Sequence, residues 1–166
     1  MTDGVLRNLE RRKRKKKFDC PSIAVIVLAF NEEQNLPVML DESIEFLTDY
    51  VPEWELLVVD DGSSDGTRAV AERYAAEHEH VRVLVHEVNR GMGAGMKTGI
   101  TAATADYFTI IAGDGQHPTS ELAVMIPGLK EADIVTTYHS NQREPHRRVL
   151  SKAFRVAMRA ACGIDF

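Results

Sequence analysis

Hydrophobic positions along this chain alternate between short continuous runs and segments with helical spacing. The run at residues 23–29 is apolar throughout, which is typical of a strand buried on both faces of a sheet. In the next segment, 35–49, apolar residues recur every three or four positions and form one face of a helix. The same succession continues, with strands expected at 54–59, 81–85, 107–111 and 133–137, and helices at 65–78, 93–104 and 119–126.

This order of elements predicts the fold class. Strands separated by single helices pair in parallel through right-handed crossovers. We therefore expect an α/β fold with a doubly wound, mostly parallel sheet and helices on both faces. In such sheets ligands bind beyond the carboxyl ends of the strands, so the residues that follow each strand are the first candidates for chemistry.

Polar side chains, carboxylates and glycines follow four of the expected strands. In chain order they are Phe30–Glu33, Asp60 with Asp61, Asn89–Gly91 and Gly113–His117. Carboxylates at strand ends suit a hard divalent cation and sugar hydroxyls. Asp60 and Asp61 also begin a good turn and helix cap, so one of them is expected only to shape the loop. For Asp114, between two glycines, ligand binding and a turn-stabilising role are the two alternatives.

A glycine-rich run occupies residues 91–99. A Walker A loop would need a glycine where Met96 stands, and the third glycine of a GxGxxG motif would have to come one residue later. We therefore do not expect a phosphate-binding loop of either kind. The glycines are expected instead to bring a helix close against a nucleotide, with Lys97 free to meet phosphate charge.

Composition and charge narrow the function classes. The chain is 44% hydrophobic and 27% charged, as in globular proteins, and its longest apolar run, residues 23–30, is far shorter than the ~20 residues of a membrane span. Cys20 and Cys162 are too few for a disulfide framework and lack metal-ligand spacing, which favours reduced thiols in a cytoplasmic protein. The net charge of −5 divides into +6 over residues 1–18, −15 over 19–142 and +4 over 143–166.

The basic ends call for a separate interpretation, because the acidic middle part disfavours nucleic acid as a partner. Residues 11–17 are seven consecutive positive charges. We interpret residues 1–20 as a basic, disordered tail, either a solvated segment or an electrostatic tether to anionic lipid. Residues 147–162 have the spacing of a cationic amphipathic helix, which packs on its own domain or lies at a membrane surface.

Taken as an ordered set, the motifs resemble glycosyltransferase family 2, which has the GT-A fold. They are Leu28-Ala-Phe-Asn-Glu32, Val58-Val-Asp-Asp-Gly-Ser-Ser-Asp-Gly-Thr67, Asn89-Arg-Gly-Met-Gly-Ala-Gly-Met-Lys-Thr-Gly99 and Gly113-Asp-Gly-Gln-His-Pro118. The Gln-His-Pro segment is similar to that of the polyprenyl-phosphate branch, which includes dolichyl-phosphate mannose synthases. The resemblance covers about residues 22–160, within an expected domain at 21–166.

The resemblance implies a site for a nucleotide-sugar donor and a divalent metal, Mg²⁺ or Mn²⁺. Asp114 would be the catalytic position and would bind the metal on the donor diphosphate with Gln116. The implied donor contacts are Leu28, Phe30, Glu32, Val59, Asp60, Asp61, Lys97, Gly113, Asp114 and Gln116. The implied contacts with the acceptor phosphate are His139, Arg147, Arg148 and Ser151.

The implied function is inverting transfer of a sugar from a GDP- or UDP-linked donor to a polyprenyl phosphate, by a peripheral protein at the inner face of the membrane. The pattern departs from the family at Ala112, where the first aspartate of the metal motif is missing. The chain also stops before its relatives do, so the domain is expected to be C-terminally incomplete or to need an oligomer or partner subunit. The alternative is a nucleotide-sugar-binding module without transferase activity. A nucleotidyltransferase ranks last, because no glycine- and arginine-rich loop follows the first strand.

Overall fold

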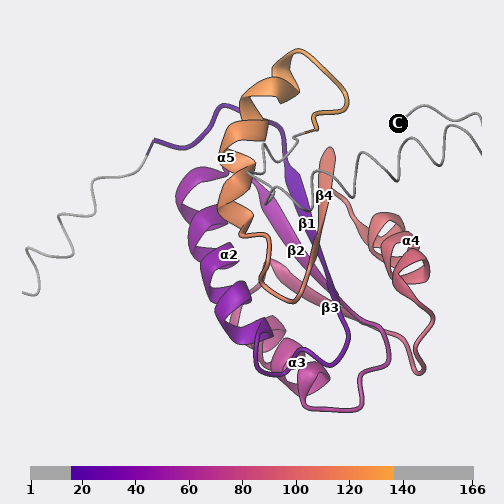
Figure 1. Ribbon diagram of the computed structural model, residues 1–166. Helices are drawn as coiled ribbons and strands as arrows, with labels where there is room; N and C mark the ends of the chain where they lie inside the picture. Colours follow the sequence, from indigo (N-terminus) through magenta and orange to yellow (C-terminus); the bar gives the residue numbers. More distant parts are fainter. Residues whose placement is uncertain (1–15, 137–166) are drawn as a thin grey trace, which may run out of the picture. The chain divides into compact units, whose positions relative to one another are not determined.

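The computed structural model describes residues 16–136, which form a parallel sheet with helices on both faces (Figure 1). The strands are β1 (Ile23–Ala29), β2 (Trp54–Asp60), β3 (Val81–Val85) and β4 (Tyr107–Ala112). The helices are α2 (Leu36–Tyr50), α3 (Thr67–Glu77), α4 (Met92–Ala102) and α5 (Leu122–Met125), the last flanked by the 3₁₀ segments η1 (Thr119–Glu121) and η2 (Ile126–Lys130).

The strand order is β3-β2-β1-β4, and every pair is parallel. The chain moves from β1 through β2 to β3 in one direction and then crosses back to β4 on the other side of β1. With right-handed crossovers, this reversal places α2 and α3 on one face and α4 on the other, as Figure 1 shows. The predicted α/β fold class, a doubly wound parallel sheet with helices on both faces, is confirmed.

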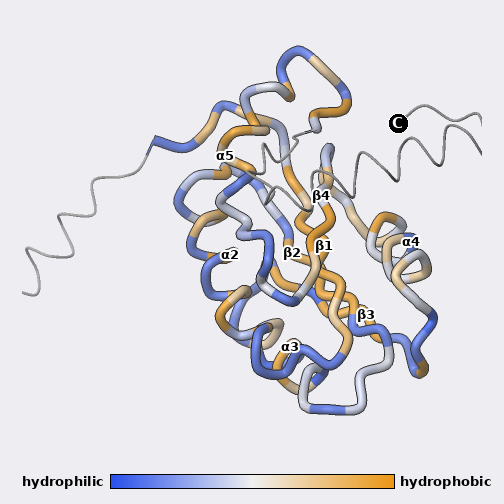
Figure 2. Tube along the Cα trace, viewed as in Figure 1, coloured by the Kyte–Doolittle hydropathy of each residue, from blue (hydrophilic) through white to orange (hydrophobic). Residues whose placement is uncertain are grey.

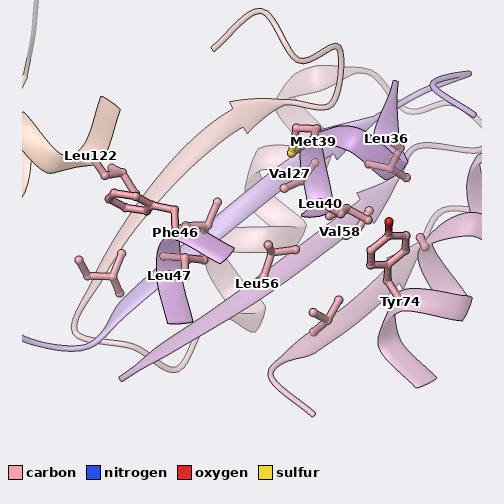
Figure 3. Packing of buried hydrophobic residues seen from close by; sticks show 14 of the residues in the cluster. Val27, Leu36, Met39, Leu40, Phe46, Leu47, Leu56, Val58, Tyr74 and Leu122 are labelled. Atoms are coloured by element: carbon pink, nitrogen blue, oxygen red, sulfur yellow. The ribbon is translucent and has the colours of Figure 1, made fainter. Parts of the chain in front are cut away.

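The larger part of the hydrophobic core lies between the sheet and the helices α2 and α3 (Figure 3). Alternate residues of β1 and β2 point into it, among them Val27, Leu56 and Val58. They meet the apolar stripe of α2, whose buried residues follow helical spacing: Leu36, Met39, Leu40, Ser43, Phe46 and Leu47. Coloured by hydropathy, the chain is most apolar along the strands of the sheet (Figure 2).

On the opposite face, α4 packs against β1 through two of its glycines. A Cβ atom added at Gly99 would lie 2.3 Å from Cγ2 of Ile26, and one added at Gly95 would lie 3.2 Å from Cδ2 of Leu28. Both distances are shorter than an ordinary carbon–carbon contact. Gly95 and Gly99 therefore bring the helix close to the sheet. The expectation that these glycines approach a nucleotide is wrong for these two positions.

The expected fifth strand at 133–137 is also wrong over residues 133–136, which are not in a strand. The backbone keeps turning after η2, because the N–H groups of Glu131 and Ala132 both bond to the carbonyl of Gly128. Val135 then packs against Gly128, and Ile134 is 81% exposed. Local turning thus overrides the β-branched pattern. This segment lines an apolar cavity of about 600 Å³ beside β4, together with Tyr107, Ile110, Leu122 and Ile126.

Order extends into the segment that we interpret as a tail. Lys17 donates a hydrogen bond from Nζ to the carbonyl of Val51, and the backbone N–H of Phe18 bonds to the carbonyl of Tyr50. The Phe18 ring lies 6.1 Å from that of Tyr50. The chain is therefore packed against the end of α2 from Lys17 onward.

Candidate functional site

The carboxyl ends of β2, β1 and β4 meet at one edge of the sheet. The backbone N–H of Asp61 bonds to the carbonyl of Ala29 at 2.9 Å, and that of Gly113 bonds to the carbonyl of Leu28 at 2.8 Å. The acidic residues at the end of β2, Asp60 and Asp61, and the glycine-bordered segment that follows β4 therefore flank the end of β1 on either side. This is the position at which the strand order reverses, where doubly wound sheets bind ligands.

The carboxylate of Asp61 forms three hydrogen bonds at this edge. Its Oδ1 accepts from the backbone N–H of Arg90 at 2.9 Å, and its Oδ2 accepts from that of Gly91 at 2.8 Å. His86 adds a third partner, with Nδ1 2.6 Å from Oδ1. Burial by itself would raise the pKa of Asp61, but the hydrogen bonds from Arg90, His86 and Gly91 outweigh it and lower the pKa. The carboxylate is thus held ionised, with about one of its four acceptor positions left for a ligand.

Asp60 is wholly buried and differs from its neighbour in its partners. Its Oδ1 accepts a hydrogen bond from the backbone N–H of Ser63 at 3.2 Å. No partner for its buried Oδ2 lies within the described part of the chain. A buried carboxylate oxygen without a partner is costly, so Asp60 suits a donor supplied by a ligand or a bound water.

The loops after β1 and β2 are tied together by side chains. Asn31 has a left-handed backbone, with φ of 58°, and its Oδ1 accepts from the backbone N–H of Ser64 at 2.9 Å. Glu33 accepts from the backbone N–H of Gly66 at 2.8 Å. The carboxylate of Glu32 accepts from Nδ2 of Asn35 at 2.7 Å, so it is engaged within its own loop. These contacts form a fixed base for the site.

Four other predicted donor contacts divide between the surface and the core. Phe30 is 45% exposed at the end of β1, and Lys97 is exposed on α4. The side chains of Leu28 and Val59 instead pack in the apolar cluster beneath α4, and Val59 is fully buried. For Leu28 and Val59, only the backbone is in a position to face a ligand.

Asp114 and Gln116 lie in the loop after β4, which turns at Gly115 with φ of 71°. Asp114 is half-buried, and its Oδ1 accepts a hydrogen bond from the backbone N–H of Gln116 at 3.0 Å. Gly113 is buried, and a Cβ there would lie 3.1 Å from the carbonyl oxygen of Leu28, so a small residue lets this loop approach β1.

Metal ligation by the chain itself is sparse at this edge. Among residues 16–136, no three His, Cys, Asp or Glu side chains are arranged to hold a metal ion. Asp114 and Gln116 offer a carboxylate oxygen and an amide oxygen. This donor set fits Mg²⁺ or Mn²⁺, which bind through one or two carboxylates, substrate phosphates and waters.

His86 was not predicted from the sequence, although it is 6% exposed and contacts two candidate elements. Its Nε2 lies 2.8 Å from Oγ1 of Thr98 on α4. A histidine directly after a strand was the only signal in the sequence, and its partners Asp61 and Thr98 are 25 and 12 residues away. The predicted acceptor contacts lie outside the described residues: His139, Arg147, Arg148 and Ser151.

A parallel sheet of this topology, with acidic groups and a glycine-bordered aspartate at its carboxyl edge, defines a domain of the GT-A type. A sequence profile described as "Glycosyl transferase family 2" matches residues 24–161. The chain belongs to this family, and the resemblance inferred from its motifs is confirmed.

Several curated relatives are transferases whose names include a lipid phosphate. A dolichyl-phosphate beta-glucosyltransferase of Trichomonas vaginalis is 32% identical over 157 residues, which cover 85% of this chain and 48% of the relative. An undecaprenyl-phosphate 4-deoxy-4-formamido-L-arabinose transferase of Proteus mirabilis is 29% identical, covering 85% and 44%. The chain thus spans about half the length of the curated relatives it matches.

Solved structures agree with this assignment. A mannosyltransferase of Pyrobaculum calidifontis in complex with GDP-Man and Mn²⁺ is 28% identical, with a TM-score of 0.51 over 66% of this chain and 34% of that chain. A glucosyl-3-phosphoglycerate synthase of M. tuberculosis, 22% identical, shares the fold with a TM-score of 0.57 over 83% and 53%. Within residues 16–136, no helix has the length and apolar character needed to cross a bilayer.

Proposed function

We propose that this chain carries the donor site of an inverting glycosyltransferase that moves a sugar from a nucleoside diphosphate to a polyprenyl phosphate. The observation that carries the proposal is the gathering of Asp60, Asp61 and the Asp114 loop at the carboxyl ends of three adjacent strands. Family membership supports the reaction class, and the lipid phosphates named for the relatives support the acceptor class.

The surroundings of the residues at this edge support a particular role for each in donor binding. Asp61 keeps one acceptor position for an N–H or O–H of the nucleoside, and Oδ2 of Asp60, which has no partner among residues 16–136, could take a second donor. The exposed ring of Phe30 offers a flat surface to the base. Lys97 is exposed on α4 and brings a positive charge that could meet phosphate charge.

Asp114 and Gln116 would hold Mg²⁺ or Mn²⁺, with the donor diphosphate completing the coordination. The metal would supply positive charge to the leaving diphosphate. Because Asp114 and Gln116 would leave most of the coordination sphere to the diphosphate and water, we expect the metal and the nucleotide to bind together.

In the proposed reaction an oxygen of the acceptor phosphate forms a bond to the sugar C1 while the C1–O bond to the diphosphate breaks. The nucleoside diphosphate leaves with the electron pair, and the configuration at C1 inverts. A phosphate monoester with a second pKa of ~6 is mostly dianionic at neutral pH. The acceptor therefore needs no strong general base.

The proposed location is the inner face of an anionic membrane, where the basic residues 11–17 would act as an electrostatic tether. Deleting residues 1–15 removes most of this charge and keeps Lys17 and Phe18, which contact α2. Binding of this variant to vesicles that contain anionic lipid should weaken and lose its dependence on salt. Unchanged binding would rule out the tether.

Calorimetric titration of the full chain with GDP and UDP, with and without Mg²⁺ or Mn²⁺, tests the donor site. We expect metal-dependent binding of one nucleotide, and a loss of about tenfold or more in affinity in Asp114→Ala. Asp133→Ala, an exposed aspartate beside the apolar cavity, is the matched control and should bind as wild type. Absence of any binding would refute the donor site, and binding without transfer to a polyprenyl phosphate would favour a nucleotide-sugar-binding module.

A further inference from the structure

His86 joins three segments that are distant in the sequence. It follows β3, its Nδ1 lies 2.6 Å from Oδ1 of Asp61 at the end of β2, and its Nε2 lies 2.8 Å from Oγ1 of Thr98 on α4. The imidazole side chain is 4% exposed. Both ring nitrogens are thus used inside the protein, so the histidine has no surface role.

The direction of the two hydrogen bonds follows from the chemistry of the partners. The carboxylate of Asp61 can only accept, so the proton lies on Nδ1 of His86. In the neutral ring Nε2 is then an acceptor, and the hydroxyl of Thr98 donates to it. In this neutral form the chain of bonds runs from the Thr98 hydroxyl through the ring to the carboxylate, and each polar atom of the ring has a partner.

This chain of bonds controls the placement of Asp61. The carboxylate has few ways to turn, because the backbone N–H groups of Arg90 and Gly91 hold it from one side and His86 from another. Without the imidazole, Oδ1 would lose its shortest contact, and the end of β3 would lose its side-chain contact with Thr98 on α4. The acceptor position that Asp61 keeps for a ligand would then lose its fixed direction.

We propose that His86, held by Thr98, is a positioning residue for nucleotide binding. It orients the Asp61 carboxylate toward the nucleoside and fixes the Arg90–Gly91 turn beside it. The inference rests on the proposed donor site, and it assigns to His86 an effect on nucleotide affinity rather than a contact with the nucleotide. An imidazole with only a packing role would contribute to stability and leave affinity unchanged.

Two pairs of variants separate these roles. The amide of asparagine reaches the place of Nδ1, so His86→Asn keeps a donor for Asp61. The amide of glutamine reaches the place of Nε2, so His86→Gln keeps the partner of Thr98 and loses the donor to Asp61. Thr98→Val removes the hydroxyl with little change in shape, and Thr98→Ser restores it. His80→Gln makes the same substitution at a half-exposed histidine before β3, at the opposite edge of the sheet.

The full-length variants are titrated with GDP and UDP in the presence of Mn²⁺, and their thermal midpoints are measured alongside. We expect His86→Gln to lose about tenfold in affinity for the nucleotide that wild type binds, and His86→Asn to lose clearly less. Thr98→Val should lose about fivefold, and Thr98→Ser should stay within about twofold of wild type. His80→Gln should bind as wild type.

A second measurement does not depend on the variants folding. The ¹⁵N shifts of the His86 ring in the wild-type protein should show the tautomer protonated at Nδ1. A ring protonated at Nε2 alone would have no hydrogen to donate to Asp61, and would overturn the proposal.

The two proposals fail in different ways. If wild type binds a nucleotide and both His86 variants bind it equally well while melting at lower temperature, His86 has only a structural role and the donor site stands. If wild type binds neither GDP nor UDP, the donor site is refuted, and positioning by His86 falls with it.

Discussion

Replacing Gly99 with alanine tests the close packing of α4 on the sheet. The new Cβ would lie 2.3 Å from Cγ2 of Ile26, which is more than ~1 Å inside ordinary contact. Ile26 is fully buried in the central strand, so the helix has to move instead. Overpacking of this kind costs about 1–3 kcal/mol, and the better helix propensity of alanine returns up to ~1 kcal/mol.

We therefore expect Gly99→Ala to lower the free energy of unfolding by about 1–2 kcal/mol. Gly93→Ala is the matched control in the same helix, because within residues 16–136 no atom beyond its chain neighbours and its own helix backbone lies within 4 Å of the added Cβ. That variant should gain about 0.5–1 kcal/mol from helix propensity alone. The two alanine variants thus differ in the sign of their effect as well as in its size.

Urea unfolding followed by circular dichroism measures this difference. With a slope of ~1.5 kcal/mol per M, the midpoints of the two variants should lie about 1.5 M apart, with wild type between them. If Gly99→Ala is as stable as Gly93→Ala, the close approach of α4 to Ile26 is wrong. A shift of α4 in Gly99→Ala should also weaken the contact between Thr98 and His86. The NMR signals of the His86 ring should therefore change in this variant.

Two further variants test polar contacts of the fold. Asp61→Asn should destabilise the protein by about 1–3 kcal/mol near neutral pH, because an amide places N–H donors against backbone N–H groups. The pKa of Asp61 is lowered in the fold, so the stability difference between wild type and Asp61→Asn should be complete above the ordinary pKa of 3.8 and shrink as pH falls below it. A difference in urea unfolding that does not change with pH would contradict an ionised Asp61. Tyr74→Phe should cost about 1 kcal/mol, because the hydroxyl donates to Oδ1 of Asp41 at 2.7 Å. Burial and Asp41 raise the pKa of Tyr74 from 10.0 to about 12. The stability from this hydrogen bond is therefore complete below pH 10 and is lost as pH rises toward 12. Equal stability of wild type and Tyr74→Phe across pH 8–11 would exclude the bond.

The pattern of the sequence predicted the elements whose burial is continuous or regular. The fully apolar run of β1 and the helical spacing of α2 left little choice, because each has one arrangement that buries its apolar residues. The segment at 133–136 was mispredicted, because Ile134 and Val135 read as strand residues while backbone hydrogen bonds to Gly128 decide the local path.

The site was predicted to the level of the strand ends, and its internal organisation was not. Asp60 and Asp61 are adjacent in the sequence, yet Asp61 is held by three donors, while Oδ2 of Asp60 has no partner in the part of the chain that the structure describes. The difference comes from His86 and the Arg90–Gly91 turn, which are brought there by the pairing of β2 with β3. A single sequence does not encode such long-range partners in any local pattern.

The tied loops at this edge have a consequence for amide hydrogen exchange. The N–H groups of Ser64 and Gly91 lie in loops, yet each donates to a side chain of another loop and should exchange slowly for its position. In the loop after β4, the N–H of Gln116 bonds within its own turn, to Asp114. The half built on Asp61 is thus held by bonds between loops before any ligand arrives, whereas the turn at Asp114–Gln116 is closed by a bond within itself. Slowed exchange on adding a ligand should therefore be concentrated in residues 113–117, while the half built on Asp61 changes little.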